Sequence, residues 1–447
     1  MSVKLVIKRA IPFCKRFKLF TNELDVEGVS LTPYLEQGSD AFQLSGNQSK
    51  SCKVGVLMFY LGIDIGKRTH VASIMNAEGK VVLKGFSFLN SLEGAHALLD
   101  RLNAFSATPD DFLIGMEATG HYWLALFSFF DEQGFYTHVI NPIQTDGWRK
   151  GTEIRKRKND IIDSVLIADL IRYGSFQETA LANETMFSLR QLTRYRSYLV
   201  GTAGDFKRKI IAILDQIFPE YETVFSKVGI FGKASKAVLL EFSSPEKFNQ
   251  VSAKVLAEAL GLASRNRVGT AKAEALKSAA AHSFGIRFAK EAFVFQMRSM
   301  IDQLIFLEDQ IKQTENEIEQ LMASLDSVIE TIPGIGPVLG ATILGEIGDI
   351  HKFSNPKKLV AYAGIDASVT QSGEYLATHN VMSKRGSPYL RKALFQAALI
   401  ASRHDPVLKA FYDKKRAEGK HHLTALGAVS RKLCYIIHAI LTKNEPY

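Results

Sequence analysis

The sequence is poor in cysteine, with only Cys14, Cys52 and Cys434 among its 447 residues, and their spacing matches no metal-binding motif. This scarcity argues against a disulfide scaffold and favours a reducing compartment. No apolar stretch is long enough to cross a bilayer, and the basic N-terminus lacks an apolar segment followed by a cleavage site. These absences predict a cytoplasmic protein with no membrane partner.

The charged residues are unequally divided by sign, with 55 Lys and Arg against 46 Asp and Glu, and the formal net charge is +9. Such an excess suits a polyanionic partner such as nucleic acid, although it does not by itself identify one. A chain of 447 residues is long enough for two or three domains with sizeable cores.

The first 57 residues differ in composition from the rest of the chain. Scattered Lys and Arg are followed by a stretch rich in Ser, Gln, Gly and Asn over residues 36–53. Their weak hydrophobic periodicity predicts a loosely attached or disordered extension. Met58 directly precedes the first convincing strand, so it is an alternative start of the protein.

The region that follows alternates short apolar runs with turns. Three β-rich runs between residues 59 and 88 predict an antiparallel meander. A helix over 92–102, a strand over 111–117, a helix over 122–133 and a strand over 136–140 are expected next. This βββαβαβα order is that of the RNase H-like fold, so an α/β domain is predicted, with acids at neighbouring strand ends where open sheets keep their chemistry.

Four acidic residues in this region are the strongest candidates for chemistry. Asp64 lies in an otherwise apolar strand, where an acid is costly unless it is paired or metal-bound, although it could also cap its own turn. Asp160 and Asp163 share a helix face, a spacing that also suits an ordinary helix N-terminus. Together with Glu117, and without a His or Cys ligand set, they favour a site for Mg²⁺ or Mn²⁺. Two such ions can stabilise both oxygens of a phosphodiester exchange.

Several segments offer contacts to phosphate groups. Residues 332–344 are predicted to form two helices around a Gly334-Ile335-Gly336 turn, a helix-hairpin-helix-like motif with exposed N–H groups, although such turns also join ordinary helices. The remaining candidates are basic, and the last three of them could equally line solvated helix faces: Arg155, Lys156, Arg157, Lys158, Lys384, Arg385 and Arg391.

Between these regions the apolar residues recur every seven positions in two helices. Four heptads in the second helix predict coiled-coil packing, within the chain or between protomers. The rows are Leu192, Leu199, Phe206 and Ile213 in the first helix and Met297, Leu304, Ile311, Ile318 and Leu325 in the second. The sequence therefore predicts four parts: a disordered extension over 1–57, an RNase H-like domain over 58–180, a helical coiled-coil region over 181–326 and a helical C-terminal domain over 327–447.

Four stretches, at residues 62–67, 117–123, 158–164 and 332–397, resemble the DEDD-class insertion-sequence transposases of the insertion sequence 110 family. This family includes Piv-type invertases and bridge-RNA-guided recombinases, and the resemblance extends from Met58 to the C-terminus. Asn159 and Ser164 depart from the commoner Thr and Ala of the family, but they leave the acids intact.

The resemblance implies a RuvC-like tetrad of Asp64, Glu117, Asp160 and Asp163 and a nucleophilic serine at Ser372. It implies that Ser372 attacks DNA with metal assistance at the tetrad, that donor and target DNA are chosen by an element-encoded RNA, and that the protein is a homodimer or homotetramer near the nucleoid. The residues alone do not distinguish Ser372 from Ser368, Ser383 or Ser387.

Two other classes of function remain open from the sequence. Residues 61–66 also resemble the first phosphate loop of sugar kinases and actin-like ATPases, but no second Asp-X-Gly loop or adenosine loop is placed convincingly. A non-catalytic nucleic-acid-binding protein would use the hairpin and the heptad helices, and it would leave the four acids unexplained.

Overall fold

The computed structural model describes residues 58–152, 159–174, 176, 184–225, 229–367 and 381–447, and the backbone of 371–372 and 375–376. Some predictions concern residues outside this set. These are the extension over 1–57, the basic run Arg155, Lys156, Arg157 and Lys158, and the side chain of Ser372.

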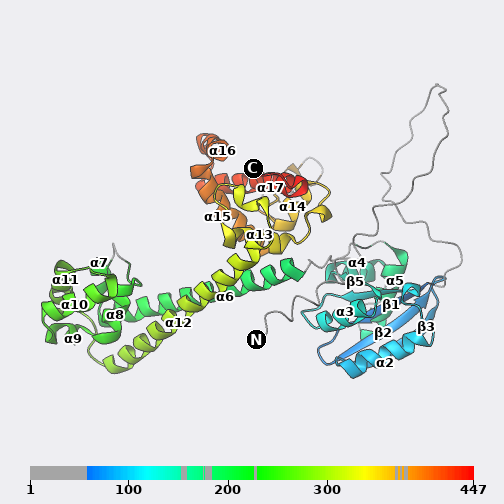
Figure 1. Ribbon diagram of the computed structural model, residues 1–447, viewed down its shortest axis with the longest axis horizontal. Coiled ribbons are helices and arrows are strands. Elements are labelled where there is room, and N and C mark those ends of the chain that lie inside the picture. Colours follow the sequence, from blue (N-terminus) through cyan, green and yellow to red (C-terminus); the bar gives the residue numbers. More distant parts are fainter. Residues whose placement is uncertain are drawn as a thin grey trace. The chain divides into compact units, whose positions relative to one another are not determined.

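A five-stranded sheet forms the N-terminal region, in the order β3-β2-β1-β4-β5 (Figure 1). Strands β1 (Phe59–Asp64), β2 (Thr69–Asn76) and β3 (Val81–Leu89) form the predicted antiparallel meander. Strands β4 (Phe112–Glu117) and β5 (Tyr136–Ile140) run parallel to β1. The last residues of β1 and β4 therefore lie at the same edge of the sheet.

Helices cover both faces of this sheet. On one face, α2 (Leu92–Asn103) and α3 (Trp123–Glu132) pack through Leu98 and Phe130 against inward residues of the strands. On the other face, α5 (Asp160–Tyr173) packs mainly against β1 to β4, with Ile140 of β5 in the same apolar cluster, and α4 (Pro142–Thr152) contacts α5. A short 3-10 helix, η1 (Pro109–Asp111), precedes β4.

The close approach of α5 to the sheet depends on glycine. A Cβ atom at Gly62 of β1 would lie 2.1 Å from the carbonyl oxygen of Ser164, and a Cβ at Gly115 of β4 would lie 2.8 Å from Ile171. The helix is also held by a 2.7 Å hydrogen bond between the hydroxyls of Ser164 and Ser73. The absence of two side chains thus lets α5 pack directly against β1 and β4.

Two long helices, α6 (Glu184–Ile217) and α12 (Lys290–Ala323), pack against each other. The predicted heptad rows are buried or half-buried in both helices, and Leu199 and Leu304 are among the buried members. Part of α6 and α12 shares a core with five shorter helices. These are α7 (Tyr221–Phe225), α8 (Lys233–Glu241), α9 (Pro245–Gln250), α10 (Ala253–Ser264) and α11 (Thr270–Ala281).

The other ends of α6 and α12 contribute to a C-terminal helical core. Its α-helices are α13 (Pro337–Ile347), α14 (Pro356–Ala363), α15 (Pro388–His404), α16 (Pro406–Ala417) and α17 (His422–Lys443). Two 3-10 helices, η2 (Val328–Thr331) and η3 (Ile350–Lys352), complete the region. A two-stranded sheet pairs β6 (Gln371–Ser372) with β7 (Tyr375–Leu376), so Ser372 lies in a short antiparallel pair.

The predicted hairpin of two helices is wrong in its first half, because a 3-10 helix rather than an α-helix precedes the turn. Only four residues form η2, and Pro333 favours an extended conformation at the residue before it, so the backbone cannot build a full α-helical turn there. The second helix, α13, begins with Pro337 at its first position, as expected.

Helix α17 corrects the expectation that no stretch could cross a bilayer, because its 22 residues are long and apolar enough by length and composition. Its apolar residues Val429, Leu433 and Ile437 are buried in the C-terminal core, where the helix packs against α15. Packing of this kind accounts for the composition without a membrane.

Candidate active site

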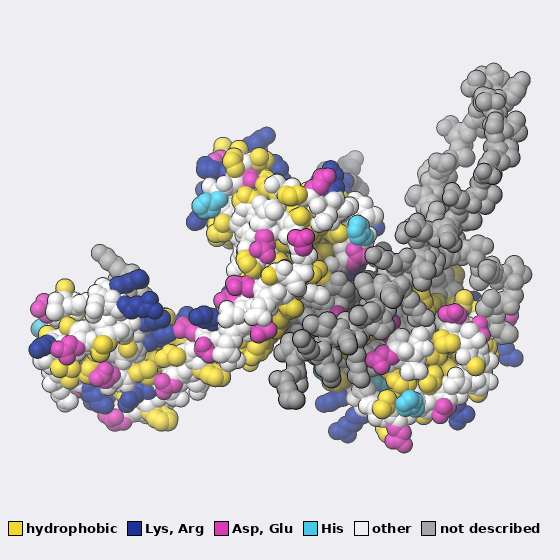
Figure 2. Space-filling model, in the orientation of Figure 1, with side chains coloured by type: hydrophobic (Ala, Val, Ile, Leu, Met, Phe, Trp, Pro, Cys, Tyr) yellow, Lys and Arg dark blue, Asp and Glu magenta, His cyan; other side chains and the backbone are white. Residues whose placement is uncertain are grey.

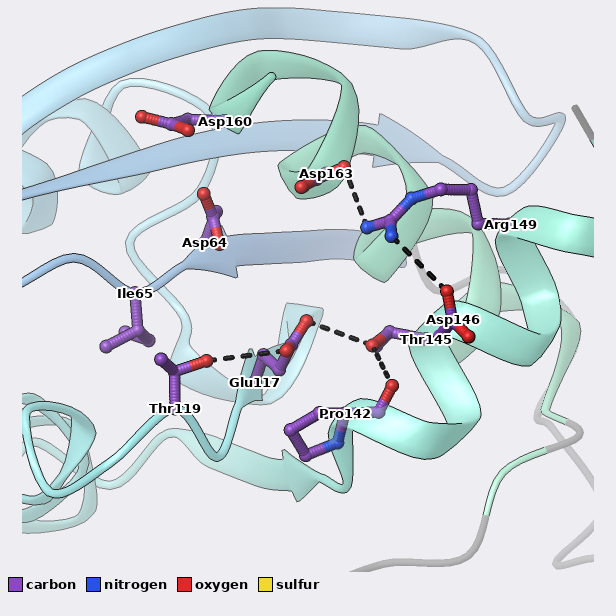
Figure 3. A pocket seen from close by; sticks show the side chains of 10 residues that line it. All are labelled: Asp64, Ile65, Glu117, Thr119, Pro142, Thr145, Asp146, Arg149, Asp160 and Asp163. Atoms are coloured by element: carbon purple, nitrogen blue, oxygen red, sulfur yellow. Dashed lines mark hydrogen bonds and ion pairs between the residues drawn. The ribbon is translucent and has the colours of Figure 1, made fainter. Parts of the chain in front are cut away.

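All four predicted acids line one cavity of about 430 Å³ (Figure 3). Asp64 and Glu117 are the last residues of the parallel strands β1 and β4, and Asp160 and Asp163 occupy the first turn of α5. Parallel strand ends and the close packing of α5 thus bring together residues that lie far apart in the sequence. The other lining residues are Ile65, Thr119, Pro142, Thr145, Asp146 and Arg149.

The first turn of α5 is built by local hydrogen bonds. The side chain of Asn159 accepts a 2.8 Å hydrogen bond from the backbone N–H of Ile162, which caps the helix. Asp160 is exposed at the first helical position, whereas the Asp163 residue is only 5% exposed. Asn159 therefore supplies the N-cap of α5, and Ser164 supplies the contact to β2 described above.

Glu117 is held by two threonine hydroxyls. Thr145 Oγ1 lies 2.9 Å from Glu117 Oε2, and Thr119 Oγ1 donates to Oε1 over 3.4 Å. Thr145 Oγ1 also lies 2.9 Å from the carbonyl oxygen of Pro142, so its single proton is shared between two acceptors. These contacts, one from α4 and one from the turn after β4, hold the Glu117 carboxylate in the cavity.

Arg149 brings a positive charge into the cavity. Its Nη2 lies 2.9 Å from Asp163 Oδ1, and its Nη1 lies 3.8 Å from Asp146 Oδ1. The Asp163 side chain is 6% exposed and the Arg149 side chain 18%, so the pair is largely removed from water. An isolated buried carboxylate would cost several kcal/mol, and the guanidinium therefore compensates Asp163.

The oxygen-rich lining fits a hard divalent cation in its chemistry but not yet in its geometry. Four carboxylates without His or Cys are the donor set that Mg²⁺ or Mn²⁺ prefers. Asp163 Oδ1 is a buried oxygen without a well-aligned hydrogen bond in the described part of the chain. Among the described residues, however, no group of three acidic, His or Cys side chains is placed to hold one ion. The side chains would have to turn inward to share a cation.

The turn that follows Asp64 is shaped by His70. The backbone N–H of Gly66 donates to His70 Nδ1 over 3.3 Å, so this nitrogen carries no proton in the folded chain. The imidazole is buried, and burial lowers its pKa, while a hydrogen bond to Asn90 opposes that shift. A neutral His70 therefore supports the backbone next to the cavity.

The C-terminal candidates for phosphate binding are not equivalent. Lys384 and Arg385 are exposed, whereas Arg391 is half-buried and its Nη1 donates to the carbonyl oxygen of Ala363 over 3.2 Å. Gly334 has a φ of +95° and packs against α15, so its role in the fold is steric. Gly336 is exposed at the N-terminus of α13, and a Cβ there would meet nothing within 4 Å.

An ion pair between the partly exposed Arg194 of α6 and the buried Glu346 of α13 joins α6 to the C-terminal region. Glu346, 1% exposed in α13, accepts from Arg194 Nε over 2.6 Å and from Arg194 Nη2 over 3.0 Å. The second carboxylate oxygen also accepts from the hydroxyl of Ser387, whose side chain caps α15. The hydrogen bond to Glu346 raises the pKa of Arg194. The segment that leads out of the Ser372 region is thereby anchored at Ser387.

The basic side chains concentrate near the C-terminus. Residues 381–447 contain 13 Lys and Arg and only four Asp and Glu. Dark blue side chains gather over α16 in Figure 2, where Lys414, Lys415 and Arg416 occupy the last helical turn. This surface has the sign of charge that a polyanion requires.

Sequence reasoning missed Arg149 and Thr145. Arg149 belongs to the basic segment that precedes α5, but only residues 155–158 of that segment are predicted as phosphate contacts. Spacing alone does not show which basic side chain enters a cavity. A threonine in a helix gives no signal of its own. The one usable hint was that Asp146 and Arg149 stand three apart, on one face of a predicted helix.

Two family models match the chain. A model of DEDD transposases of the IS110 type, described as "Transposase", matches residues 61–219. A model described as "Transposase IS116/IS110/IS902 family" matches residues 326–413. The first match contains the acidic cavity, and the second contains Ser372 and the start of the basic C-terminal region.

Curated relatives align along most of the chain. A 44.8 kDa protein of insertion element IS116 from Streptomyces clavuligerus is 25% identical over 385 residues, 86% of this chain and 94% of the relative. A 43.6 kDa protein of IS110 from Streptomyces coelicolor is 23% identical, over 87% and 95%. The pilin gene-inverting protein of Moraxella lacunata is 24% identical, over 87% and 97%.

Proposed function

The chain belongs to the IS116/IS110/IS902 family of transposases, and we propose that it cuts and rejoins DNA as the transposase of an insertion sequence. The observation that carries the proposal is the cavity lined by Asp64, Glu117, Asp160 and Asp163 within the matched DEDD region. A pilin gene-inverting relative that aligns over 87% of this chain and 97% of its own length supports a recombinase that exchanges strands rather than a nuclease that only cuts.

The N-terminal region is proposed to be an RNase H-like, RuvC-like domain over residues 58–180. Support comes from the strand order β3-β2-β1-β4-β5, with an antiparallel meander followed by two parallel strands. A helical region over 181–326 and a C-terminal domain over 327–447 complete the proposed organisation, after an extension over 1–57. The packing of α6 against α12 supports a coiled-coil arrangement in the middle region.

The acidic cavity is proposed to hold Mg²⁺ or Mn²⁺ through Asp64, Glu117, Asp160 and Asp163. A bound divalent cation supplies stabilisation of the charge that develops on phosphate oxygens and on the leaving oxygen. The chain's own contribution is to hold the carboxylates: Thr145 and Thr119 orient Glu117, and the Asn159 cap fixes the first turn of α5.

Ser372 is proposed as the nucleophile. Its Oγ would attack phosphorus, so that an Oγ–P bond forms while a bond from phosphorus to a sugar oxygen breaks. The serine proton passes to a base, and the departing sugar oxygen takes up a proton. The phosphoserine link keeps the energy of the broken phosphodiester bond available for rejoining. Gly373 beside it suits close approach of a DNA backbone, and Lys384, Arg385 and Arg391 follow in the same segment as phosphate ligands.

The partners proposed are double-stranded donor and target DNA, an element-encoded bridge RNA and further copies of the chain in a homodimer or homotetramer. Base pairing would choose the sequence while the protein holds backbone and shape, by analogy with guided nucleases. The basic runs at Arg155–Lys158 and the hairpin glycines Gly334 and Gly336 are proposed contacts to these nucleic acids. The location proposed is the cytoplasm at the nucleoid, without a membrane.

The test is strand transfer by purified protein with Mg²⁺, DNA that carries the two element ends, a target duplex and RNA transcribed from the DNA flanking the gene. We expect recombinant junctions that require protein, metal and both DNAs. The matched reaction contains ATP and no nucleic acid. Nucleotide hydrolysis there, without any recombinant product in the full reaction, would overturn the proposal in favour of a kinase-like or ATPase activity.

A further inference from the structure

One cavity residue, Arg149, carries a positive charge and has no part in the proposed chemistry. Arg149 lies on the last turns of α4, and its guanidinium points at Asp163 on α5 across the cavity (Figure 3). It approaches the acid that is the most buried of the four, with 6% of that side chain exposed. A positive side chain therefore stands where a metal ligand is proposed.

We propose that Arg149 is an internal counter-ion of the acidic cavity, which neutralises Asp163 until a divalent cation displaces it. This inference rests on the proposed function, because it takes Asp163 as a metal ligand. A buried carboxylate needs an opposite charge at all times, since leaving it unpaired costs several kcal/mol. Arg149 satisfies that need before metal binding, and the cation satisfies it afterwards.

The two positive groups compete for the same carboxylate. Arg149 Nη2 is 2.9 Å from Asp163 Oδ1, and a magnesium ion would need to lie about 2.1 Å from a carboxylate oxygen. A guanidinium and a divalent cation that share one carboxylate repel each other strongly at low dielectric. Binding of the cation therefore requires Arg149 to leave Asp163.

The geometry of the pair makes that exchange possible. Arg149 Nε and Asp163 Oδ1 are both buried without a well-aligned hydrogen bond in the described part of the chain, so charge rather than a bidentate fork holds the pair. The second contact of the guanidinium, to Asp146, is 3.8 Å long. Asp146 is half exposed, and it offers a carboxylate toward which the displaced side chain can turn.

The experiment measures Mg²⁺ and Mn²⁺ binding to the full chain by calorimetry, without nucleic acid. Arg149→Gln removes the competing charge, and we expect it to bind each cation about tenfold more tightly than the natural protein. Lys150→Gln is the matched control, because Lys150 is the next residue, pairs with Asp146 at 2.6 Å and has a side chain 76% exposed. We expect its affinity to stay within about twofold, since an exposed pair contributes little.

Equal or weaker cation affinity in Arg149→Gln would overturn the counter-ion role while leaving the proposed function in place. A natural protein and variants that all bind no divalent cation would overturn both. If Arg149→Gln does not fold without metal, Mg²⁺ should restore its circular dichroism spectrum and NaCl of equal ionic strength should not. Failure of that rescue would count against the counter-ion role, because the cation could not then replace Arg149 at Asp163.

Discussion

The N-terminal and C-terminal regions of the chain differ most in charge. Residues 58–174 contain 12 Lys and Arg against 14 Asp and Glu, whereas residues 381–447 contain 13 against four. The excess of positive charge in the whole chain therefore does not surround the acidic cavity. In the proposed function, the first region supplies oxygen ligands and the second attracts and holds phosphates.

Two ion pairs, each with one buried acid, provide a second comparison. In the N-terminal region Arg149 faces Asp163, and in the helical core outside residues 381–447 Glu346 of α13 accepts from Arg194. The two pairs differ in geometry. Glu346 is bound through both oxygens and by Ser387 as well, whereas the Arg149 pair lacks aligned hydrogen bonds. The Glu346–Arg194 pair is therefore suited to stay formed, whereas Arg149 can leave Asp163 when another cation binds.

The largest effect is expected from Asp64→Asn, which removes one carboxylate from the acidic cavity and leaves the basic C-terminal region unchanged. Loss of one carboxylate ligand should reduce recombination at least about 1000-fold, because metal stabilisation contributes several kcal/mol to the barrier. Binding of DNA and RNA should stay within about twofold, since the basic region is unchanged. Asp131→Asn, an exposed acid of α3 outside the cavity, is the control. Strand-transfer and gel-shift assays measure both quantities, and full activity in Asp64→Asn would contradict the account.

The second effect tests the buried acid of the C-terminal core. Glu346→Gln should lower the free energy of unfolding by about 2 kcal/mol, because the buried neutral amide loses the charge-assisted hydrogen bonds from Arg194 and Ser387. Glu315→Gln is matched to it, since Glu315 pairs with Arg196 on the same helix α6 but both side chains are 30% exposed. That change should cost less than about 1 kcal/mol. Guanidinium unfolding curves measure both, and equal shifts would show that burial does not distinguish the pairs.

A smaller effect is expected from the basic surface of α16 and the turn after it. Lys414→Gln with Lys420→Gln removes two exposed positive charges, so the slope of log affinity against log salt should fall by about two. Metal binding at the acidic cavity should not change. Lys80→Gln with Lys84→Gln makes the same change of charge in the N-terminal region and should leave the slope unaltered. If both double substitutions change the slope equally, the C-terminal region does not bind nucleic acid more strongly than the N-terminal region.

The smallest effect concerns pH and the turn after Asp64. The pKa of His70 lies below its ordinary value of 6.5, so the unfolded chain takes up the proton first. His70 therefore stabilises the fold above about pH 6.5, and that contribution is lost as the pH falls from there through the lower folded pKa. Melting temperatures from pH 8 to pH 5 should fall less steeply in His70→Gln than in the natural protein. His121→Gln, at an exposed position, should keep the natural steepness, and the opposite ranking would contradict the assignment.

Local patterns in the sequence predicted much of the fold, and the misses have physical causes. Strand β5 begins and ends where expected, at Tyr136 and Ile140, because an apolar run lies between a Gly turn and a Pro. The prediction of an α-helix before Pro333 is wrong, because residues 328–331 form a 3-10 helix and the residue before a proline disfavours the α-helical conformation. Alternating apolar residues and turn residues act locally, so they predict single strands and helices better than the segments that connect them.

The candidate site was predictable only in part. The four acids could be chosen because strand ends and a helix start are visible in the sequence, and the structure brings them to one cavity. Arg149 and Thr145 could not be identified from the sequence, because their roles depend on how α4 packs against α5. Glu346 lies in an otherwise apolar helix, and its partner Arg194 is 152 residues away. Tertiary packing determines which distant side chains form such pairs, and the hydrophobic periodicity of the sequence carries no information about it.

The most direct test of the central claim, that acidic cavity and serine act in one DNA-joining reaction, is trapping of a covalent protein–DNA adduct. Natural protein with Mg²⁺, element DNA and RNA should yield an adduct that survives denaturation, and Ser372→Ala should yield none while still binding both nucleic acids. Ser368→Ala is the control and should keep the adduct. A denaturation-resistant adduct formed by Ser372→Ala would contradict the account, because the nucleophile would then be another residue.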